Sequence, residues 1–299
     1  MIRLVPAVLV LQAVAASGAP PAKIQNPPAS AVKLLWHAPQ PLTPADWFWG
    51  PGGKERAPLP PFRFIKEDLG GTNAKVKVHD ARGVTWSVKF GAEVHSETFV
   101  PRLVHAAGYF VDATYFVREG TIEGAQPLKR AKPFIGRNGK FRYARFKLHD
   151  EKALPYADPY NWSWTDNPFT GSHELNGLKI LMMLVSNWDA TDATDKDGNT
   201  AVLRRTADSA YVYLFTDWGA TMGKWGGVFG REKWAPDGYA GQTRKLVKSD
   251  REGELTWGYF GKHKRDLTQG IRIDDVSWIV RYLSRFTDEQ IRAGMERAR

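Results

Sequence analysis

The chain has 299 residues and no cysteine, which excludes disulfide bonds, a thiolate zinc site and a cysteine nucleophile. A hydrophobic content of 42% fits a globular protein with one large or two modest domains. The net charge of +10 permits anionic partners such as nucleotides, nucleic acids or anionic glycans. However, the basic residues are scattered and no nucleic-acid-binding motif is present, so we do not expect nucleic-acid binding.

Residues 1–19 have the pattern of a secretory signal peptide. Arg3 precedes an apolar run over residues 4–11, and an Ala-x-Ala site follows at Ala13 to Ala15. The apolar run is too short to span a bilayer. We therefore expect an exported protein, periplasmic or extracellular, whose mature chain has no transmembrane segment. An uncleaved anchor is the alternative. The lack of cysteine suits a bacterial periplasm or the outside of a bacterial cell.

The next segment, residues 20–61, is rich in proline and aromatic residues. It holds 11 of the 19 prolines, which excludes a regular helix or a central strand. Large aromatic side chains usually bury, and Trp36, Trp47, Phe48 and Trp49 punctuate the tract. We therefore expect an N-terminal arm that docks on the folded domain rather than a free linker.

Residues 62–130 predict a small β-rich lobe with one helix. Hydrophobic alternation over residues 75–79 and 84–90, with a turn between them, indicates a β-hairpin. Lys89 lies on the hairpin face opposite its apolar residues. Spacing by four of apolar residues predicts a helix over residues 94–107, which carries Glu97. Strands followed by one helix indicate an α+β arrangement.

Residues 131–299 predict a second, mainly helical lobe. The helix that ends near Val185 is apolar almost all round, which is typical of a buried helix. Residues 202–203 and 211–215 predict a pair of strands, and residues 218–262 a long irregular segment. A helix is expected near residues 276–283, and a capping box at Thr287 begins the last one.

Two upstream motifs could contact phosphate. Gly70, Gly71 and Thr72 lie in a turn where backbone N–H groups can approach a phosphate closely, although a plain hairpin turn has the same pattern. Lys89 can hold phosphate oxygens if its strand face covers a cleft, and is solvated otherwise. Glu97, eight residues later, would orient Lys89.

Two downstream acids complete the pattern. Asp189 follows the buried helix and can accept a proton from a hydroxyl, although Asn and Asp also favour plain turns. Asp217 directly follows a hydrophobic strand, and Gly219 stands two residues later. An acid in this position suits a Mg²⁺ ligand. A strand Lys, a helix Glu, a loop Asp and an Asp-x-Gly, in this order, are the parts of a phosphoryl-transfer site.

These motifs resemble the atypical branch of the protein-kinase-like superfamily, which includes HipA-type, phosphatidylinositol, CotH-type spore-coat and secretory-pathway kinases. The chain is also similar to exported bacterial proteins with an Asn-Pro-Phe-Thr-Gly run, here residues 167–171. The resemblance covers residues 64–220. It implies a two-lobed α+β fold, ATP with Mg²⁺ or Mn²⁺ as cofactor, and phosphoryl transfer to an unknown protein, lipid or glycan acceptor.

The resemblance also implies roles for individual residues. The glycine turn with Thr72 would cover the phosphates, Lys89 would contact them while held by Glu97, Asp189 would be the catalytic Asp, and Asp217 would bind the metal. One departure is that Thr194 stands where such loops usually place a second metal-binding Asn. Our metal candidate for that position is Asp192, with Asp195 and Asn199 as alternatives.

Other interpretations of the protein's function stay open. ATP is scarce outside the cytoplasm, so an inactive kinase-like binding protein is one alternative. A second is a calcium-binding protein, because residues 189–199 are rich in oxygen ligands, although they depart from the EF-hand pattern. A third is a glycan-binding envelope protein, for which the candidate tryptophans are Trp162, Trp164, Trp225 and Trp234. A glycosidase with an acidic pair is also left open.

Overall fold

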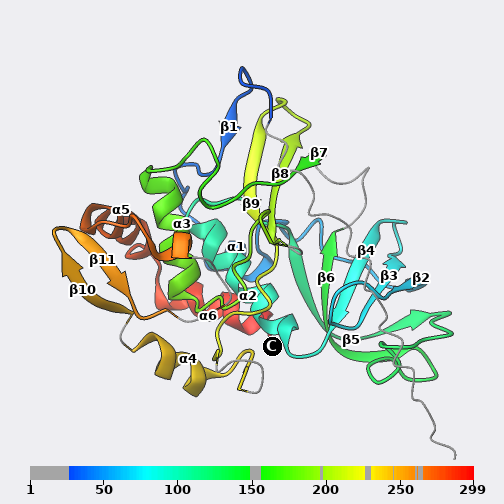
Figure 1. Cartoon of the computed structure of the whole chain (residues 1–299). Coiled ribbons are helices and arrows are strands. Elements are labelled where there is room, and N and C mark those ends of the chain that lie inside the picture. Colours follow the sequence, from blue (N-terminus) through cyan, green and yellow to red (C-terminus); the bar gives the residue numbers. More distant parts are fainter. Residues whose placement is uncertain are drawn as a thin grey trace, which may run out of the picture.

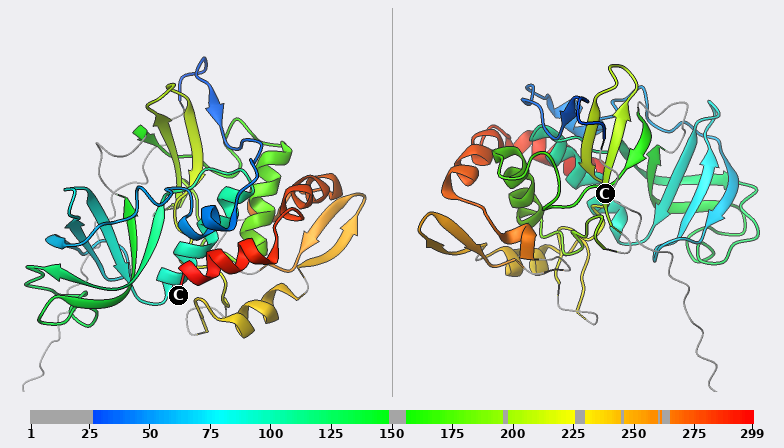
Figure 2. Two further views of the ribbon diagram at one scale, coloured as in Figure 1. Left: turned by 180° about the vertical axis from the view of Figure 1, so that it is seen from behind. Right: turned by 45° about the horizontal axis from the view of Figure 1, so that its top comes forward.

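The computed structural model describes residues 27–148, 156–195, 198–225, 230–244, 246–259, 261 and 265–299. The expected signal peptide, residues 1–19, lies outside this range. The mixed helix and strand content expected from the sequence is confirmed (Figure 1). A β-barrel lies at one end of the molecule and a β-hairpin with helices at the other, which both views of Figure 2 also show.

The barrel is closed, with the strand order β2-β3-β4-β6-β5. Its strands are β2 (Phe62–Asp68), β3 (Lys75–His79), β4 (Thr85–Phe90), β5 (Thr114–Glu123) and β6 (Lys140–Leu148). The predicted hairpin is confirmed, since β3 and β4 pair antiparallel. The alternate residues Trp86, Val88 and Phe90 are buried in the barrel core, so the opposite face of β4 presents Lys89 outside the barrel. The strand β6, which lies after the boundary expected at residue 130, completes the barrel.

The helix α2 (Glu93–Ala106) joins the barrel to a second, larger hydrophobic core. Its Phe99, Val100 and Val104 belong to that core, together with residues of α3 (His173–Leu184). It also contacts β4, β5 and β6. The side chains of Glu93 and Glu97 lie one helical turn apart on the same face.

A four-stranded sheet lies between the barrel and the outer helices (Figure 1). Its order is β1-β9-β8-β7, with bounds β1 (Lys33–Leu34), β7 (Tyr156–Tyr160), β8 (Thr200–Arg205) and β9 (Tyr211–Phe215). The predicted strand pair is confirmed, and β8 and β9 pair antiparallel. The strand β9 is buried along its whole length, so it fixes the loop that follows it, where Asp217 lies.

The remaining elements differ in part from the mainly helical expectation. They are α4 (Pro236–Thr243), β10 (Val247–Arg251), β11 (Glu254–Trp257), the 3₁₀ helix η1 (Arg265–Thr268), α5 (Ile273–Leu283) and α6 (Asp288–Arg297). The segment expected to be irregular thus holds α4 and a hairpin. All of β10 is exposed, so no apolar period marks it in the sequence. The capping box that begins α6 is confirmed.

The proline-rich arm contacts the folded chain at two places. Its β1 pairs parallel with β9 at the edge of the sheet. Its short helix α1 (Pro44–Trp49) packs on α6, and Trp47 is buried. A helix forms here despite the prolines because Pro44 stands in the first turn, where a missing N–H is tolerated.

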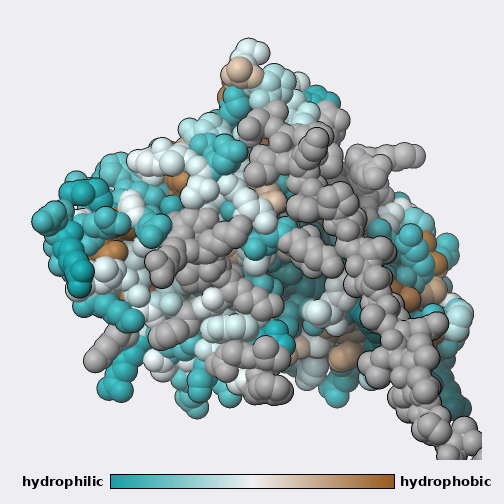
Figure 3. Space-filling model, viewed as in Figure 1, coloured by the Kyte–Doolittle hydropathy of each residue, from teal (hydrophilic) through white to brown (hydrophobic). Residues whose placement is uncertain are grey.

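Where Figure 3 colours the surface by hydropathy, it is mostly teal to white, with small and separate brown areas. Among the described residues, no helix combines the length and apolarity that crossing a bilayer requires.

Candidate functional site

Most of the predicted site residues meet at one cavity of about 500 Å³ between the barrel and the loops that end α3 and β9. Its walls come from four separate stretches of chain, within residues 71–75, at 89, within 189–199 and at 217. The lining residues are Gly71, Thr72, Asn73, Lys75, Lys89, Asp189, Thr191, Asp195, Asn199 and Asp217. Glu97 stands directly behind this wall, in contact with Lys89. The structure therefore brings together the strand Lys, the helix Glu and the two loop Asp residues.

Lys89 is buried and surrounded by acids. Its Nζ donates to an oxygen of Glu97 and, at 2.8 Å, to Oε2 of Glu93. It also lies 3.9 Å from Oδ2 of Asp217. Burial by itself would lower the pKa of Lys89, but the charges of Glu97 and Asp217 outweigh it and raise this pKa above its usual value. Lys89 is therefore a fixed positive charge at the cavity wall.

Glu97 is held by a second cation that the sequence did not reveal. Nε of Arg145, on β6, donates to Oε2 of Glu97 at 2.5 Å, while Oε1 accepts from Lys89. Burial would raise the pKa of Glu97, but Arg145 and Lys89 outweigh it and hold this pKa well below the usual range. Glu97 thus stays ionised, with both oxygens engaged.

Glu93 is a second acid on Lys89. It is the first residue of α2, one position before the helix expected over residues 94–107. Its Oε2 accepts from Lys89 and, at 2.7 Å, from Nδ2 of Asn73. Its Oε1 pairs with Lys233, from the segment after β9. Both carboxylate oxygens of Glu93 are therefore engaged as well.

Asp217 differs from the two glutamates because it faces the cavity. Its side chain is 42% exposed, against 7% for Glu97. Oδ1 accepts the backbone N–H of Gly219 at 2.9 Å. Partial burial and the negative charge of Glu97 raise the pKa of Asp217 to about 6, although Lys89 opposes this shift.

These contacts decide which acid can bind a metal ion. Carboxylate oxygens of Glu93, Glu97 and Asp217 all lie within 4.8 Å of one another. Cations or amide donors occupy the oxygens of both glutamates, so Asp217 is the carboxylate of this group left for a metal. A single carboxylate suits Mg²⁺, which binds through one or two carboxylates and completes its shell with phosphate oxygens and water.

Gly219 is required by close packing rather than by backbone freedom. A Cβ at this position would lie 2.7 Å from Cδ of Glu93. In addition, Oγ of Ser96 on α2 donates to the carbonyl of Gly219 at 3.1 Å. The glycine after Asp217 therefore lets the N-terminus of α2 approach the Asp217 loop, which brings Glu93 to Lys89.

A buried Asn aligns the two acidic loops. Asn187 is fully buried, and its Oδ1 accepts the backbone N–H of Asp189 at 3.1 Å. Its Nδ2 donates to the carbonyl of Asp217 at 3.4 Å. The next residue, Trp188, donates its backbone N–H to the carbonyl of Ala220 at 3.0 Å. These contacts set Asp189 and Asp217 side by side at the cavity.

Asp192, our candidate for the second metal-binding position, does not line the cavity. It is buried and accepts the backbone N–H groups of Trp164 and Thr194, each at 2.8 Å. Thr194 also donates its hydroxyl to it at 2.6 Å. These bonds stabilise the turn and engage both carboxylate oxygens of Asp192. The role of Asp192 as a metal ligand stays a prediction, and its position does not favour it.

Asn199, which we left as an alternative, lines the cavity instead. Its Nδ2 donates to the carbonyl of Asp189 at 3.0 Å and to Oγ1 of Thr191 at 3.1 Å. This orientation leaves its Oδ1, an oxygen of the type that Mg²⁺ prefers, as the atom available to a ligand. Asp195 also lines the cavity.

Only part of the glycine turn, residues 70–72, lines the cavity. Gly71, with φ of +65°, and Thr72 line the cavity. Gly70 does not, and its N–H donates to Oδ1 of Asp68 at 2.9 Å. Because its backbone donor is already used, the position of Gly70 does not favour the phosphate-binding role expected of it, which stays a prediction. The neighbouring Asn73 and Lys75 line the cavity and were not predicted.

The structure bears on two alternatives from the sequence, calcium binding and glycan binding. In the described part of residues 189–199, Asp192 is used by the turn, and the group of acids that could share a metal lies elsewhere. Trp162 and Trp164 are 1% and 2% exposed, so they build core and cannot stack on a sugar. Trp225 packs on Trp188, and Trp234 on His95.

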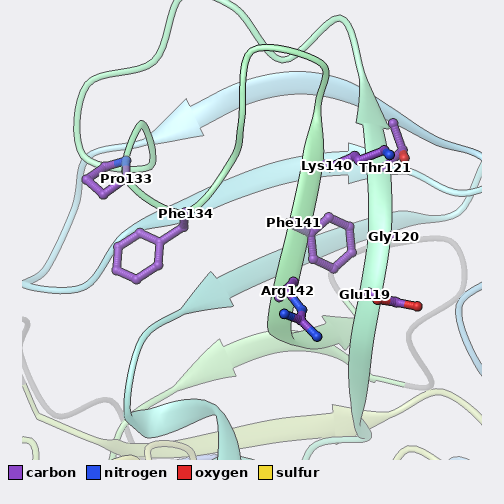
Figure 4. Close-up of a pocket in the computed structure, with 8 residues that line it drawn as sticks. All are labelled: Glu119, Gly120, Thr121, Pro133, Phe134, Lys140, Phe141 and Arg142. Atoms are coloured by element: carbon purple, nitrogen blue, oxygen red, sulfur yellow. The ribbon is translucent and has the colours of Figure 1, made fainter.

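A second and larger cavity, of about 680 Å³, lies on the barrel. Its residues belong to β5, β6 and the loop that carries Pro133 and Phe134 (Figure 4). None of the predicted site residues lines it. Size therefore does not identify the candidate site.

Comparison with known proteins gives little further information. No protein-family model matches the chain, and no curated protein matches it. The chain has low similarity to a crystal structure of the Golgi casein kinase with Mn/ADP bound, with a TM-score of 0.35, 13% identity, and coverage of 81% of this chain and 71% of that chain. A second crystal structure of the Golgi casein kinase gives a TM-score of 0.36, 11% identity, and coverage of 81% and 70%. These values are too low to carry a functional conclusion.

Proposed function

We propose that the chain is an exported protein with a kinase-like fold, in which the barrel and α2 form the first lobe. Its cavity binds a nucleoside triphosphate, such as ATP, with Mg²⁺ or Mn²⁺, and transfers a phosphoryl group to a hydroxyl acceptor. The observation that supports this proposal is the convergence of Lys89, Asp189 and Asp217 on one cavity, with Glu97 bonded to Lys89. These residues come from distant parts of the chain, and each has the chemistry that phosphoryl transfer requires.

Each residue has a role in the proposed reaction. Lys89, kept charged and oriented by its two glutamates, binds phosphate oxygens at the barrel wall. The backbone of Gly71 and the backbone and hydroxyl of Thr72 bind the phosphates from the turn after β2. Asp189, on the opposite wall, accepts the proton of the acceptor hydroxyl as the hydroxyl oxygen bonds to the terminal phosphorus. The bond between that phosphorus and the bridging oxygen breaks, and the nucleoside diphosphate leaves.

The metal would be held by Asp217 and Asn199, with Asp195 beside them. When bound, a divalent cation neutralises charge on the phosphate oxygens and orients the phosphate chain. In this proposal Asn199, and not Asp192, is the second metal ligand. The acceptor is a hydroxyl group of a protein, lipid or glycan, as the kinase resemblance implies.

Isothermal titration calorimetry with ATP and excess Mg²⁺ or Mn²⁺ tests this proposal. We expect binding to the wild-type protein and a loss of at least about a hundredfold in affinity for Asp217→Asn, because a charge-assisted metal contact is removed. The matched control is Asp208→Asn, an acid on the exposed turn after β8, which should bind as the wild type does. Equal affinity of Asp217→Asn and Asp208→Asn would contradict the proposal. Binding without transfer to any hydroxyl acceptor would leave a nucleotide-binding protein of the inactive type.

A further inference from the structure

The cavity wall is polar throughout its described lining. The ten lining residues are two threonines, two asparagines, two lysines, three aspartates and one glycine. None of these residues, as far as the structure describes the wall, offers an apolar side chain. Pockets that bury an aromatic ligand are normally lined by apolar and aromatic side chains, with only a few polar groups.

The barrel face that forms one side of the cavity continues this polar character. Strand pairing places Lys75 opposite Lys89, and Lys89 opposite Arg145. One step further along the same face, Lys77 stands opposite Ser87, and Ser87 opposite Lys147. Successive side chains of a strand point to opposite faces, so the apolar residues between these positions fill the barrel.

Burial values agree with this division of faces. Val76, Val78, Val88 and Phe146 each have 0% exposure and belong to the barrel core. They are therefore not available to a ligand outside the barrel. The face turned to the cavity carries cationic and hydroxyl side chains, which suit phosphate oxygens and not the faces of a nucleobase.

From these observations we infer that the site recognises a phosphoanhydride chain with its metal ion and not a nucleobase, so that inorganic tripolyphosphate binds about as tightly as ATP. The inference rests on the proposed function and specifies its substrate class. Stacking of a base on a protein side chain contributes about 1–3 kcal/mol, so a base-binding wall would make loss of the base weaken binding about five- to 150-fold. The described lining has no side chain on which a base could stack, so removal of the base should leave the affinity almost unchanged.

Calorimetry of the full chain at one fixed excess of Mg²⁺ tests the inference with three probes: ATP, GTP and inorganic tripolyphosphate. We expect the dissociation constants of GTP and tripolyphosphate to lie within fivefold of that of ATP. A dissociation constant for either probe more than fivefold weaker than that for ATP would overturn the inference.

The same titrations separate this inference from the proposed function. If ATP binds in a manner that depends on Asp217 and tripolyphosphate does not bind, the inference fails and the proposed function stands. If none of the three probes binds, the proposed function fails and the inference with it. The variant Lys75→Gln, in the cavity lining, should weaken all three probes by the same factor. A loss for the nucleotides alone would contradict base-independent recognition.

Discussion

The two walls of the cavity differ in how their charges are paired. On the barrel wall, Lys89, Glu93 and Glu97 are buried, and each makes at least two ionic contacts. On the loop wall, the side chain of Asp217 is 42% exposed, and the side chain of Asn199 donates hydrogen bonds through its nitrogen. Buried charges persist in a fold only when they are paired. The barrel wall is therefore a fixed support, and under the proposed function the loop wall is the side that would contact the metal ion.

The largest effect expected from this division is on the rate of transfer through Asp189. We predict that Asp189→Asn lowers kcat by about 10²- to 10⁴-fold, because it removes the proton acceptor, while the affinity for the metal–nucleotide complex stays within about threefold. Steady-state kinetics together with calorimetry would measure both. The exposed Asp166 provides the control, and Asp166→Asn should change neither. Parallel losses of binding and rate in Asp189→Asn would place this residue in the binding site only.

Substitutions in the barrel wall should lower the free energy of unfolding. Replacing Arg145 by Met leaves Oε2 of the buried Glu97 without its cation, and we expect a loss of about 3–5 kcal/mol in the free energy of unfolding. Chemical denaturation of the free protein measures this change. Arg142→Met, on the same strand but exposed, should cost less than about 0.5 kcal/mol. Similar losses for the two variants would mean that the network at Lys89 is not the support described here.

The close approach of α2 to the Asp217 loop, which connects the two walls, can be tested at Gly219. A methyl group there would press on Glu93, with a separation of 2.7 Å between the new Cβ and Cδ of the acid. We predict that Gly219→Ala destabilises the protein by about 1–3 kcal/mol through overpacking. Gly241→Ala, in α4 with no atom near the new Cβ, should be neutral or slightly stabilising. If Gly219→Ala were as harmless as Gly241→Ala, the close approach of α2 would be unnecessary.

The smallest effect concerns pH. Because the pKa of Asp217 is raised to about 6 in the folded protein, its neutral form is favoured there. Stability from this residue is therefore present below its usual pKa of 3.8 and is lost as the pH rises towards 6. Its side chain is partly exposed and screened by water, so we expect a total change of about 1 kcal/mol or less. Asp217→Asn should lack this change when the free energy of unfolding is compared at pH 4 and pH 7. A wild-type protein that gains stability from Asp217 over this range would contradict the raised pKa.

The elements around the site were predictable where a local pattern exists. Hydrophobic alternation along the strand predicted which face carries Lys89. The apolar helix that ends near Val185 and the apolar strand over residues 211–215 predicted where Asp189 and Asp217 lie. The partners of these residues were not predictable. Arg145 reaches Glu97 through the pairing of β4 with β6, and Lys233 reaches Glu93 from a distant segment. No local signal marks such contacts, because they depend on tertiary structure.

The choice among neighbouring polar residues was also beyond the sequence. Asp192, Asp195 and Asn199 are all oxygen-bearing residues of one loop, and which of them faces the cavity depends on hydrogen bonds of the turn. The same holds for Gly70 and Gly71, since the N–H of Gly70 is taken by Asp68. Sequence patterns therefore identified the loops, and only the folded backbone identified the atoms.

Anomalous diffraction from crystals grown with Mn²⁺ and a non-hydrolysable triphosphate would test the central claim most directly. Our account predicts an anomalous peak in the cavity of about 500 Å³, bonded to the carboxylate of Asp217, with the phosphate chain next to Lys89. A Mn²⁺ peak and triphosphate density at another place, with Lys89 and Asp217 untouched, would contradict it.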